Sequence, residues 1–411
     1  MKGKTLPILL AFFVMGVADA MGPMSDAVKN NYQLTNVMAT LLSFFVFIAF
    51  AVFSVPGGLL AARIGKKNLL LLGLGLNAVA MLIPCLTNPG FSLLLGCIFV
   101  LGIGTTFLQV AGNPLMRDVS AEGAYGRNLS FAQGFKGIGS TASSFIVGGT
   151  VLSSVAILAN MGWRGVFPIF FVLMAIAFVW VLTLKIEETK ADVPPSISSC
   201  LGLLQKPVFA LAVLGIFLYV GAEVCMARFL LPLMKEIGIN ENTAAKFGPA
   251  FFFLMLTVGR LLGGAVLTMM TPRSFFRLSA ALGLFGALIL MVGNPSLEMP
   301  MFDTNGVITG KVVLMWGPIL SFIGVLAAGL GFANIWPMLF SITVEEDPSR
   351  GNELSGLMCM AISGGAIVPL IMGKFVDAEM GPMAFIVPAV CFGYLLILSL
   401  KGGSKTAKCA C

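Results

Sequence analysis

Long apolar stretches make up most of the chain, and short polar segments separate them. An α-helix needs roughly 20 apolar residues to cross the hydrocarbon core of a bilayer, and these stretches are long enough to do so. The pattern predicts twelve membrane-spanning helices, at about residues 6–30, 36–62, 68–88, 91–115, 127–157, 163–185, 208–234, 243–270, 274–294, 311–340, 352–376 and 382–400.

The composition supports an integral membrane protein. Hydrophobic residues make up 58% of the 411 residues, charged residues make up 10%, and the mean hydropathy is +0.99. Such a chain has too few polar side chains to cover the surface of a soluble globule. We therefore exclude the soluble protein classes.

Basic residues gather in alternate connections between the predicted helices. Because cytoplasmic loops carry the excess of Lys and Arg, we expect this side, with both termini, to be cytoplasmic. The net charge of +7 then reflects topology and contact with anionic lipid, and nucleic-acid binding is not implied. The residues concerned are Lys2, Lys4, Arg63, Lys66, Lys67, Arg117, Arg127, Lys185, Lys190, Lys206, Lys401, Lys405 and Lys408.

Three features recur in the same order in the two halves of the chain. These are an acidic residue in a Gly-containing apolar frame, a Gly-Gly pair, and a Gly-x-Gly sequence that precedes an asparagine. They occur at Asp19, 57–58, 102–104 and Asn113 in the first half, and at Glu223, 263–264, 329–331 and Asn334 in the second.

The repeat predicts the architecture. We expect an all-α integral membrane fold of two pseudo-symmetric six-helix bundles, residues 1–186 and 207–411, joined by a cytoplasmic linker at 187–206. Two parallel repeats of this kind place a substrate site at their interface, near the middle of the membrane.

Two acidic residues, Asp19 and Glu223, lie deep in apolar stretches. An ionised carboxylate there is expensive unless it is paired, titrates or faces a water-filled cavity, so these acids indicate a transport pathway. Lys136 is the natural partner of Asp19, and protonation of the acid would release it, so the pair is a candidate switch for proton coupling. A purely structural salt bridge is the alternative. Glu223 is either a substrate ligand or a second titrating acid.

Amide side chains share helix faces in the fourth and fifth predicted spans. Gln109 and Asn113 are four residues apart, and Gln133 and Lys136 are three apart, so each pair points in one direction. Amides both donate and accept hydrogen bonds, as a neutral polyol requires. We predict substrate binding by Gln109, Asn113, Gln133, Asn334 and Trp336. Hydrogen bonding between helices is the alternative for the amides, and filling of space at a helix kink is the alternative for Trp336.

Catalysis is not expected. The chain has no histidine, its eight cysteines are scattered, and no nucleophile–base pair or metal-ligand cluster is evident, so we predict no enzyme activity, no cofactor and no metal site. Without histidine, any titrating group must be a carboxylate or a lysine.

The segment from Gly58 to Lys67 resembles the loop signature of the major facilitator superfamily. The resemblance implies gating roles for Gly58, Arg63, Gly65 and Lys66. Ala62 departs from the pattern, because the family usually has an aspartate there that locks the two halves in the outward-facing state. Arg260, in the eighth span, is assigned to the same gate or to an interhelical network.

Within the superfamily, the chain resembles the fucose:proton symporter family of sugar carriers. The resemblance covers essentially the whole chain and rests on motifs at 108–114, 132–136, 219–223, 258–260 and 363–366. It implies import of a monosaccharide with a coupling ion by a monomeric carrier. Lys136 stands where the fucose carrier has an asparagine, and Gln109 stands where it has an acid. The resemblance therefore implies the family without identifying the sugar.

Several alternatives remain open from the sequence. Carboxylate and amide oxygens also coordinate sodium, so the coupling ion is a proton or Na⁺. Two other functions are considered. The amides of the fourth and fifth spans argue against export of amphipathic compounds by proton exchange, and the retained buried charges argue against a sensor without flux. The expected location is the inner membrane of a bacterium.

Overall fold

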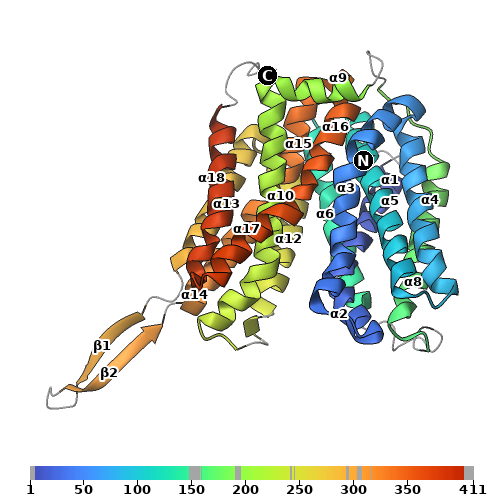
Figure 1. Ribbon diagram of the computed structural model, residues 1–411. Coiled ribbons are helices and arrows are strands. Elements are labelled where there is room, and N and C mark those ends of the chain that lie inside the picture. The colour runs from blue at the N-terminus through green and yellow to red at the C-terminus, as the bar shows by residue number, and fades with distance from the viewer. Residues whose placement is uncertain are drawn as a thin grey trace.

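The computed structural model describes residues 5–147, 158, 160–189, 196–240, 243–244, 246–292, 296–302, 308–315 and 317–401. Within these ranges the chain is helical apart from one short hairpin, and the helices stand side by side in two groups (Figure 1). The expected all-helical membrane fold of two bundles is confirmed.

The first bundle runs from α1 to α8, with short 3-10 turns labelled η. Its elements are α1 Leu6–Met15, η1 Gly16–Ala20, α2 Met21–Tyr32, α3 Asn36–Ile64, α4 Lys66–Leu86, α5 Phe91–Asp118, α6 Tyr125–Val147, η3 Gly162–Gly165 and α8 Val166–Leu182. The linker contributes α9 Ile197–Gly202 and η4 Leu203–Gln205.

The second bundle runs from α10 to α18. Its helices are α10 Pro207–Glu236, the π-helical turn η5 Lys246–Ala250, α12 Phe251–Val266, α13 Pro272–Val292, α14 Gly317–Ala333, α15 Ile335–Glu346, η6 Pro348–Arg350, α16 Gly351–Met360, η7 Ala361–Ser363, α17 Gly364–Asp377, η8 Gly381–Phe385 and α18 Ile386–Lys401.

Ten helices in the described part of the chain are long and apolar enough to cross a membrane. The other two predicted spans differ from a simple apolar helix. The first is broken at η1, which leaves a shorter apolar helix over Leu6–Ala20, and the fifth is the more polar α6. The rest of the predicted fifth span, 148–157, lies outside the described residues.

The predicted tenth span began too early. Residues 311–315 belong to strand β2, Ile308–Met315, which pairs antiparallel with β1, Ser296–Phe302, in a hairpin between α13 and α14. The span itself is formed by α14 and α15, over Gly317–Glu346. The apolar residues of β2 resemble the start of a helix in hydropathy, because a short apolar run does not distinguish a strand from a helix.

The two halves repeat the same helix contact. A Cβ added at Gly139 of α6 would lie 1.9 Å from the carbonyl oxygen of Phe13 in α1, and one added at Gly364 of α17 would lie 2.0 Å from that of Phe217 in α10. Only glycine allows backbones to approach so closely. Asp19 follows Phe13 by six residues, and Glu223 follows Phe217 by six. The two acids therefore occupy equivalent positions in the two bundles.

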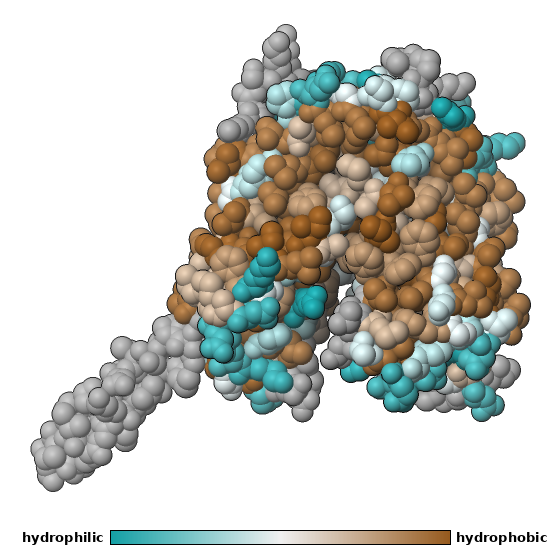
Figure 2. Space-filling view, in the orientation of Figure 1, coloured by the Kyte–Doolittle hydropathy of each residue, from teal (hydrophilic) through white to brown (hydrophobic). Residues whose placement is uncertain are grey.

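The molecule has two unlike ends. We call the end with the α3–α4 turn and α9 the linker face, and the end with the β-hairpin the hairpin face (Figure 1). Apolar side chains surround the middle of the molecule, and polar side chains gather at both ends (Figure 2). A hollow between the bundles opens at the hairpin face in the same view.

We predict that Gly364→Ala destabilises the fold. The added methyl group would collide with the backbone of Phe217, and overpacking of this kind costs about 1–3 kcal/mol of unfolding free energy. Thermal unfolding of the purified protein should show a lower Tm. Gly373→Ala in the same helix is the matched control, because its Cβ would meet nothing within 4 Å. Equal Tm values for the two variants would contradict the prediction.

Candidate functional site

Asp19 lies in η1, the break between α1 and α2. Its Oδ2 is 4.0 Å from Nζ of Lys136 on α6, as the sequence led us to expect, and it accepts a hydrogen bond of 2.5 Å from the hydroxyl of Ser140. The Asp19 side chain is 50% exposed and that of Lys136 is 19% exposed. The acid is therefore open to water in this conformation while its cation is largely covered.

Glu223, the equivalent acid on α10, has different surroundings. Nη2 of Arg260 lies 3.7 Å from Oε1 of Glu223, and the carboxylate is only 20% exposed. Nη2 also donates to the hydroxyl of Tyr219 at 3.2 Å, and Nε donates to the carbonyl of Ala333 at 3.1 Å. Arg260 thus ties α10, α12 and the end of α14 together, which fits the interhelical network considered for it.

The two acid–base pairs are close to each other across the bundles. Helices α6 and α12 pack closely there: a Cβ added at Gly137 of α6 would lie 2.8 Å from Oγ1 of Thr257 on α12. Asp19 also interacts electrostatically with Arg260. The cluster holds two acids and two bases, so the charges balance when all four groups are ionised.

The amides predicted on α5 and α6 meet in the structure. Nε2 of Gln133 donates to Oδ1 of Asn113 at 3.2 Å, and Gln109 lies one helical turn before Asn113. All three side chains are buried. The structure therefore brings together three of the five residues predicted to bind substrate.

Some of these buried polar groups have no hydrogen-bond partner. Six buried side-chain atoms in the described part of the chain have none, and three belong to predicted site residues: Oε1 of Gln109, Nδ2 of Asn113 and Nε1 of Trp336. An unsatisfied buried donor or acceptor costs about 1–3 kcal/mol. Gln109 and Asn113 belong to the first bundle and Trp336 to the second. A ligand with several hydroxyl groups can satisfy both donors and acceptors.

Asn334, unlike Gln109 and Asn113, has partners for both polar atoms of its side chain. It lies at the break between α14 and α15, where its Nδ2 donates to the carbonyl of Gly259 at 2.8 Å and its Oδ1 accepts from the hydroxyl of Ser130. The Ser130 hydroxyl is also 3.0 Å from the carbonyl of Arg260. The NH₂ group and the oxygen of the Asn334 side chain thus both join helices. The contact with Ser130 crosses between the bundles.

The bundles touch closely at the linker face. A Cβ added at Gly58 of α3 would lie 2.6 Å from the carbonyl oxygen of Asn352 on α16. The hydroxyl of Ser355 on α16 donates to the carbonyl of Val110 on α5 at 2.7 Å. This end is therefore closed, whereas the hairpin face is open.

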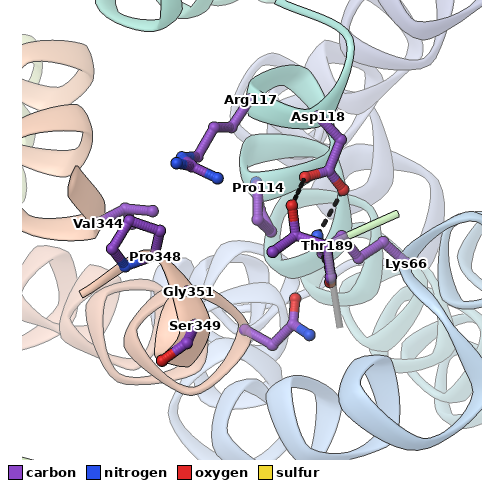
Figure 3. A pocket seen from close by; sticks show the side chains of 10 residues that line it. Lys66, Pro114, Arg117, Asp118, Thr189, Val344, Pro348, Ser349 and Gly351 are labelled. Carbon is purple, nitrogen blue, oxygen red and sulfur yellow. Dashed lines mark hydrogen bonds and ion pairs between the residues drawn. The ribbon is translucent and has the colours of Figure 1, made fainter. Parts of the chain in front are cut away.

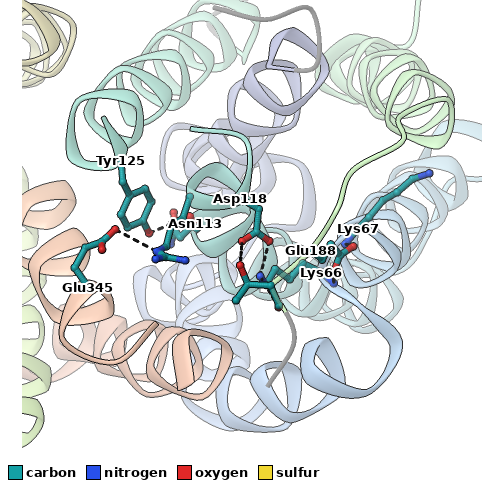
Figure 4. A network of polar contacts seen from close by, with 9 residues as sticks. Lys66, Lys67, Asn113, Asp118, Tyr125, Glu188 and Glu345 are labelled. Carbon is teal, nitrogen blue, oxygen red and sulfur yellow. Dashed lines mark hydrogen bonds and ion pairs between the residues drawn. The ribbon is translucent and has the colours of Figure 1, made fainter. Parts of the chain in front are cut away.

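A small cavity adjoins this closed contact, since Asn352 lines it (Figure 3). Lys66, Arg117 and Asp118 line it from the first bundle, and Val344 and Gly351 line it from the second. Nearby, Nε of Arg117 donates to Oε1 of Glu345 at 3.1 Å and forms an ion pair between the bundles (Figure 4).

Lys66 joins the linker to the first bundle. Its Nζ is 2.5 Å from Oδ2 of Asp118 and donates to the carbonyl of Thr189 at 3.1 Å. The Glu188 carboxylate accepts from the backbone N–H groups of Lys66 at 2.5 Å and Lys67 at 3.0 Å, which caps the start of α4 (Figure 4). These partners lie in one bundle and the linker, so Lys66 does not bridge the two bundles.

The remaining predicted gating residues form the turn before α4. Gly65 has φ +92°, a left-handed conformation that glycine adopts without strain, and it separates α3 from α4. Arg63 is exposed at the end of α3.

The other end of the linker is fastened to the second bundle. Arg350 pairs with Glu353 of α16, and its Nη2 donates to the carbonyl of Ser199 in α9 at 2.9 Å. Burial, aided by the Glu353 carboxylate, raises the pKa of the Cys200 thiol to about 12, so this thiol stays protonated at neutral pH.

Sequence reasoning missed several partners. Ser140 lies one turn after Lys136, so helical spacing could have predicted that it shares the face of Lys136. Asp118 lies just after the apolar run of the fourth span, and that position could have marked it as a partner for a cation. Glu188 and Glu345 lie 122 and 228 residues from the groups that they contact, and local spacing carries no signal for such pairs.

We predict that Gly58→Ala weakens closure at the linker face. The added methyl group would push α3 away from α16, so the buried Cys359 of α16 should be alkylated faster by N-ethylmaleimide. Peptide mass spectrometry measures the rate at that cysteine. Gly96→Ala on α5 is the control, because its Cβ would meet nothing within 4 Å. An unchanged rate at Cys359 in Gly58→Ala would contradict the prediction.

Comparisons with known proteins agree with this architecture. The chain is 31% identical over 412 residues to a glucose/galactose transporter of Brucella abortus, covering 97% of this chain and 93% of the relative. It is 23% identical to an Escherichia coli L-fucose-proton symporter, covering 96% of this chain and 92% of the relative. A crystal structure of a fucose transporter, described as in the outward conformation, superimposes with a TM-score of 0.80 at 20% identity, covering 98% and 99% of the two chains.

The family model of the Major Facilitator Superfamily matches residues 8–369. This range takes in most of both bundles, the loop signature and every predicted site residue. The chain therefore belongs to the Major Facilitator Superfamily, in the group of sugar carriers that includes the fucose:proton symporters.

Proposed function

We propose that this carrier imports a monosaccharide together with a proton, by alternating exposure of a site between its two bundles. The observation that carries the proposal is the set of unsatisfied buried polar atoms of Gln109, Asn113 and Trp336, drawn from both bundles. A sugar brings hydroxyl groups that satisfy these donors and acceptors. Relatives named for glucose, galactose and fucose transport support the same substrate class.

Proton coupling is assigned to Asp19. When the hollow at the hairpin face closes, the half-exposed Asp19 carboxylate loses water, and removal of water disfavours the ionised form. Closure therefore favours a proton on Asp19. Protonation also weakens its attraction for Lys136, which frees the ammonium to reorient as the bundles rock.

Glu223 is assigned a different role. The Arg260 guanidinium lies 3.7 Å away and is itself held by Tyr219 and a backbone carbonyl. The proposed role of Glu223 is to attract this guanidinium and so hold Arg260 in place.

A proton is proposed as the coupling ion, and the relative named L-fucose-proton symporter supports this choice. The orientation proposed for the cell puts the linker face, with Lys66 and Lys67, in the cytoplasm of a bacterium. Transport is proposed to need one copy of the chain, since the unsatisfied atoms come from its own two bundles.

We expect Asn113→Ala to raise the KM for sugar uptake by about tenfold or more. A lost hydrogen bond to a sugar hydroxyl is worth about 1–3 kcal/mol, and the change also removes the acceptor of Gln133. The KM is measured from the uptake of labelled glucose, galactose and fucose into proteoliposomes. Asn68→Ala is the control, since the exposed amide of Asn68 donates to the carbonyl of Ile64 at the end of α3. Unchanged KM values for all three sugars would contradict the assignment.

We expect Asp19→Asn to abolish uptake driven by a pH gradient while leaving sugar counterflow. The amide cannot carry a transported proton, but it keeps the size of the side chain. Measuring both assays on the same proteoliposomes separates coupling from binding. The control is Asp377→Asn, an exposed acid at the end of α17. Gradient-driven uptake that survives in Asp19→Asn would overturn the assignment of coupling to this residue.

A further inference from the structure

The Ser140 hydroxyl is nearer to Asp19 than the Lys136 ammonium is. Its Oγ lies 2.5 Å from Oδ2 of Asp19, whereas Nζ of Lys136 lies 4.0 Å from the same oxygen. Hydrogen bonds from nitrogen to oxygen span about 2.7–3.2 Å, so the ammonium attracts Asp19 without donating directly to it in this conformation. Ser140 supplies the direct hydrogen bond.

Backbone packing fixes the position of Ser140. A Cβ added at Gly16, the first residue of η1, would lie 2.4 Å from the backbone nitrogen of Ser140. The broken segment that carries Asp19 thus touches α6 at the level of the main chain. The spacing of the hydroxyl and the carboxylate is therefore set by rigid contacts, while Lys136 reaches the acid through a long, flexible side chain.

The hydroxyl carries one proton and lies near more than one acceptor. Besides Asp19, the carbonyl of Lys136 lies 3.0 Å from Oγ of Ser140, one turn earlier on the same helix. A serine in a helix commonly donates to such a carbonyl. An ionised carboxylate is the stronger acceptor, so the hydroxyl donates to Asp19 when the acid is charged. Once Asp19 is protonated, the hydroxyl can return to its own helix.

The cations around Asp19 act in the same direction as this hydrogen bond. The break η1 packs against α1, α2, α5 and α6, and α1 carries no charged residue. Charged residues occur on α2, α5, α6 and α12. Among them, the cations Lys136 and Arg260 interact with Asp19 and favour its ionised form. The charged residues on these elements are Asp26, Lys29, Arg117, Asp118, Arg127, Lys136 and Arg260.

We propose that Ser140 is a positioning residue of the coupling site, and that its hydrogen bond to ionised Asp19 sets the pH at which the carrier takes up its proton. The inference rests on the proposed function, in which Asp19 carries the coupled proton. Ser140 itself carries no transported proton. It acts through Asp19.

The test is the initial rate of gradient-driven sugar uptake across a range of external pH for wild type, Ser140→Ala and Ser140→Thr. Loss of a hydrogen bond to the charged form favours protonation, so Ser140→Ala should move the pH of half-maximal uptake upward by about one unit. Ser140→Thr keeps a hydroxyl and should restore the wild-type profile. Counterflow at one pH shows that each variant is folded and binds sugar.

Ser143→Ala is the matched control, because Ser143 lies on the same helix and its hydroxyl donates to the carbonyl of Gly139 at 2.7 Å. Its profile should superimpose on that of wild type. Profiles for Ser140→Ala and wild type that coincide would overturn the role of Ser140 and leave symport intact. Uptake by wild type that shows no dependence on pH would overturn both the role of Ser140 and the proposed proton coupling.

Discussion

An ionised carboxylate inside a membrane-spanning bundle is costly unless other groups compensate it, and this constraint governs the centre of the protein. Two acids lie there, and each has a cation nearby, Lys136 for Asp19 and Arg260 for Glu223. The break at η1 and the close packing of α1 on α6 hold Asp19 beside its partners. In the proposed cycle, one proton neutralises Asp19 and weakens its attraction for Lys136.

The two halves of the molecule share a backbone plan but not a chemistry. The glycine contacts at Gly139 and Gly364 are equivalent, and they place Asp19 and Glu223 at equivalent positions. Yet the first acid meets a hydroxyl and a flexible lysine, while the second faces an arginine that three helices hold. The proposed alternating exposure needs two bundles that move against each other, and the pseudo-symmetric halves provide them. The roles proposed for the two acids differ because their surroundings differ.

Much of the fold was predictable, because hydropathy fixes the spans and the repeat fixes their grouping. The hairpin was not, since the apolar residues of β2 have the hydropathy of a helix start. Helical spacing placed Gln109 and Asn113 on one face of α5, because residues one turn apart share a face. The contact of Asn113 with Gln133 comes from the packing of α5 against α6, which spacing within one helix does not give. Spacing also could not show that Asn334 joins Ser130 to Gly259, or that Glu188 caps α4, because those partners are distant in sequence.

The most direct test of the central claim is the simultaneous measurement of sugar and proton movement. Proteoliposomes that contain the carrier and a pH-sensitive dye in the lumen would receive labelled sugar from outside, with no imposed ion gradient. The account predicts that the lumen acidifies as the transported sugar enters, and that Asp19→Asn abolishes this acidification. Entry of sugar with no change in luminal pH would contradict proton symport.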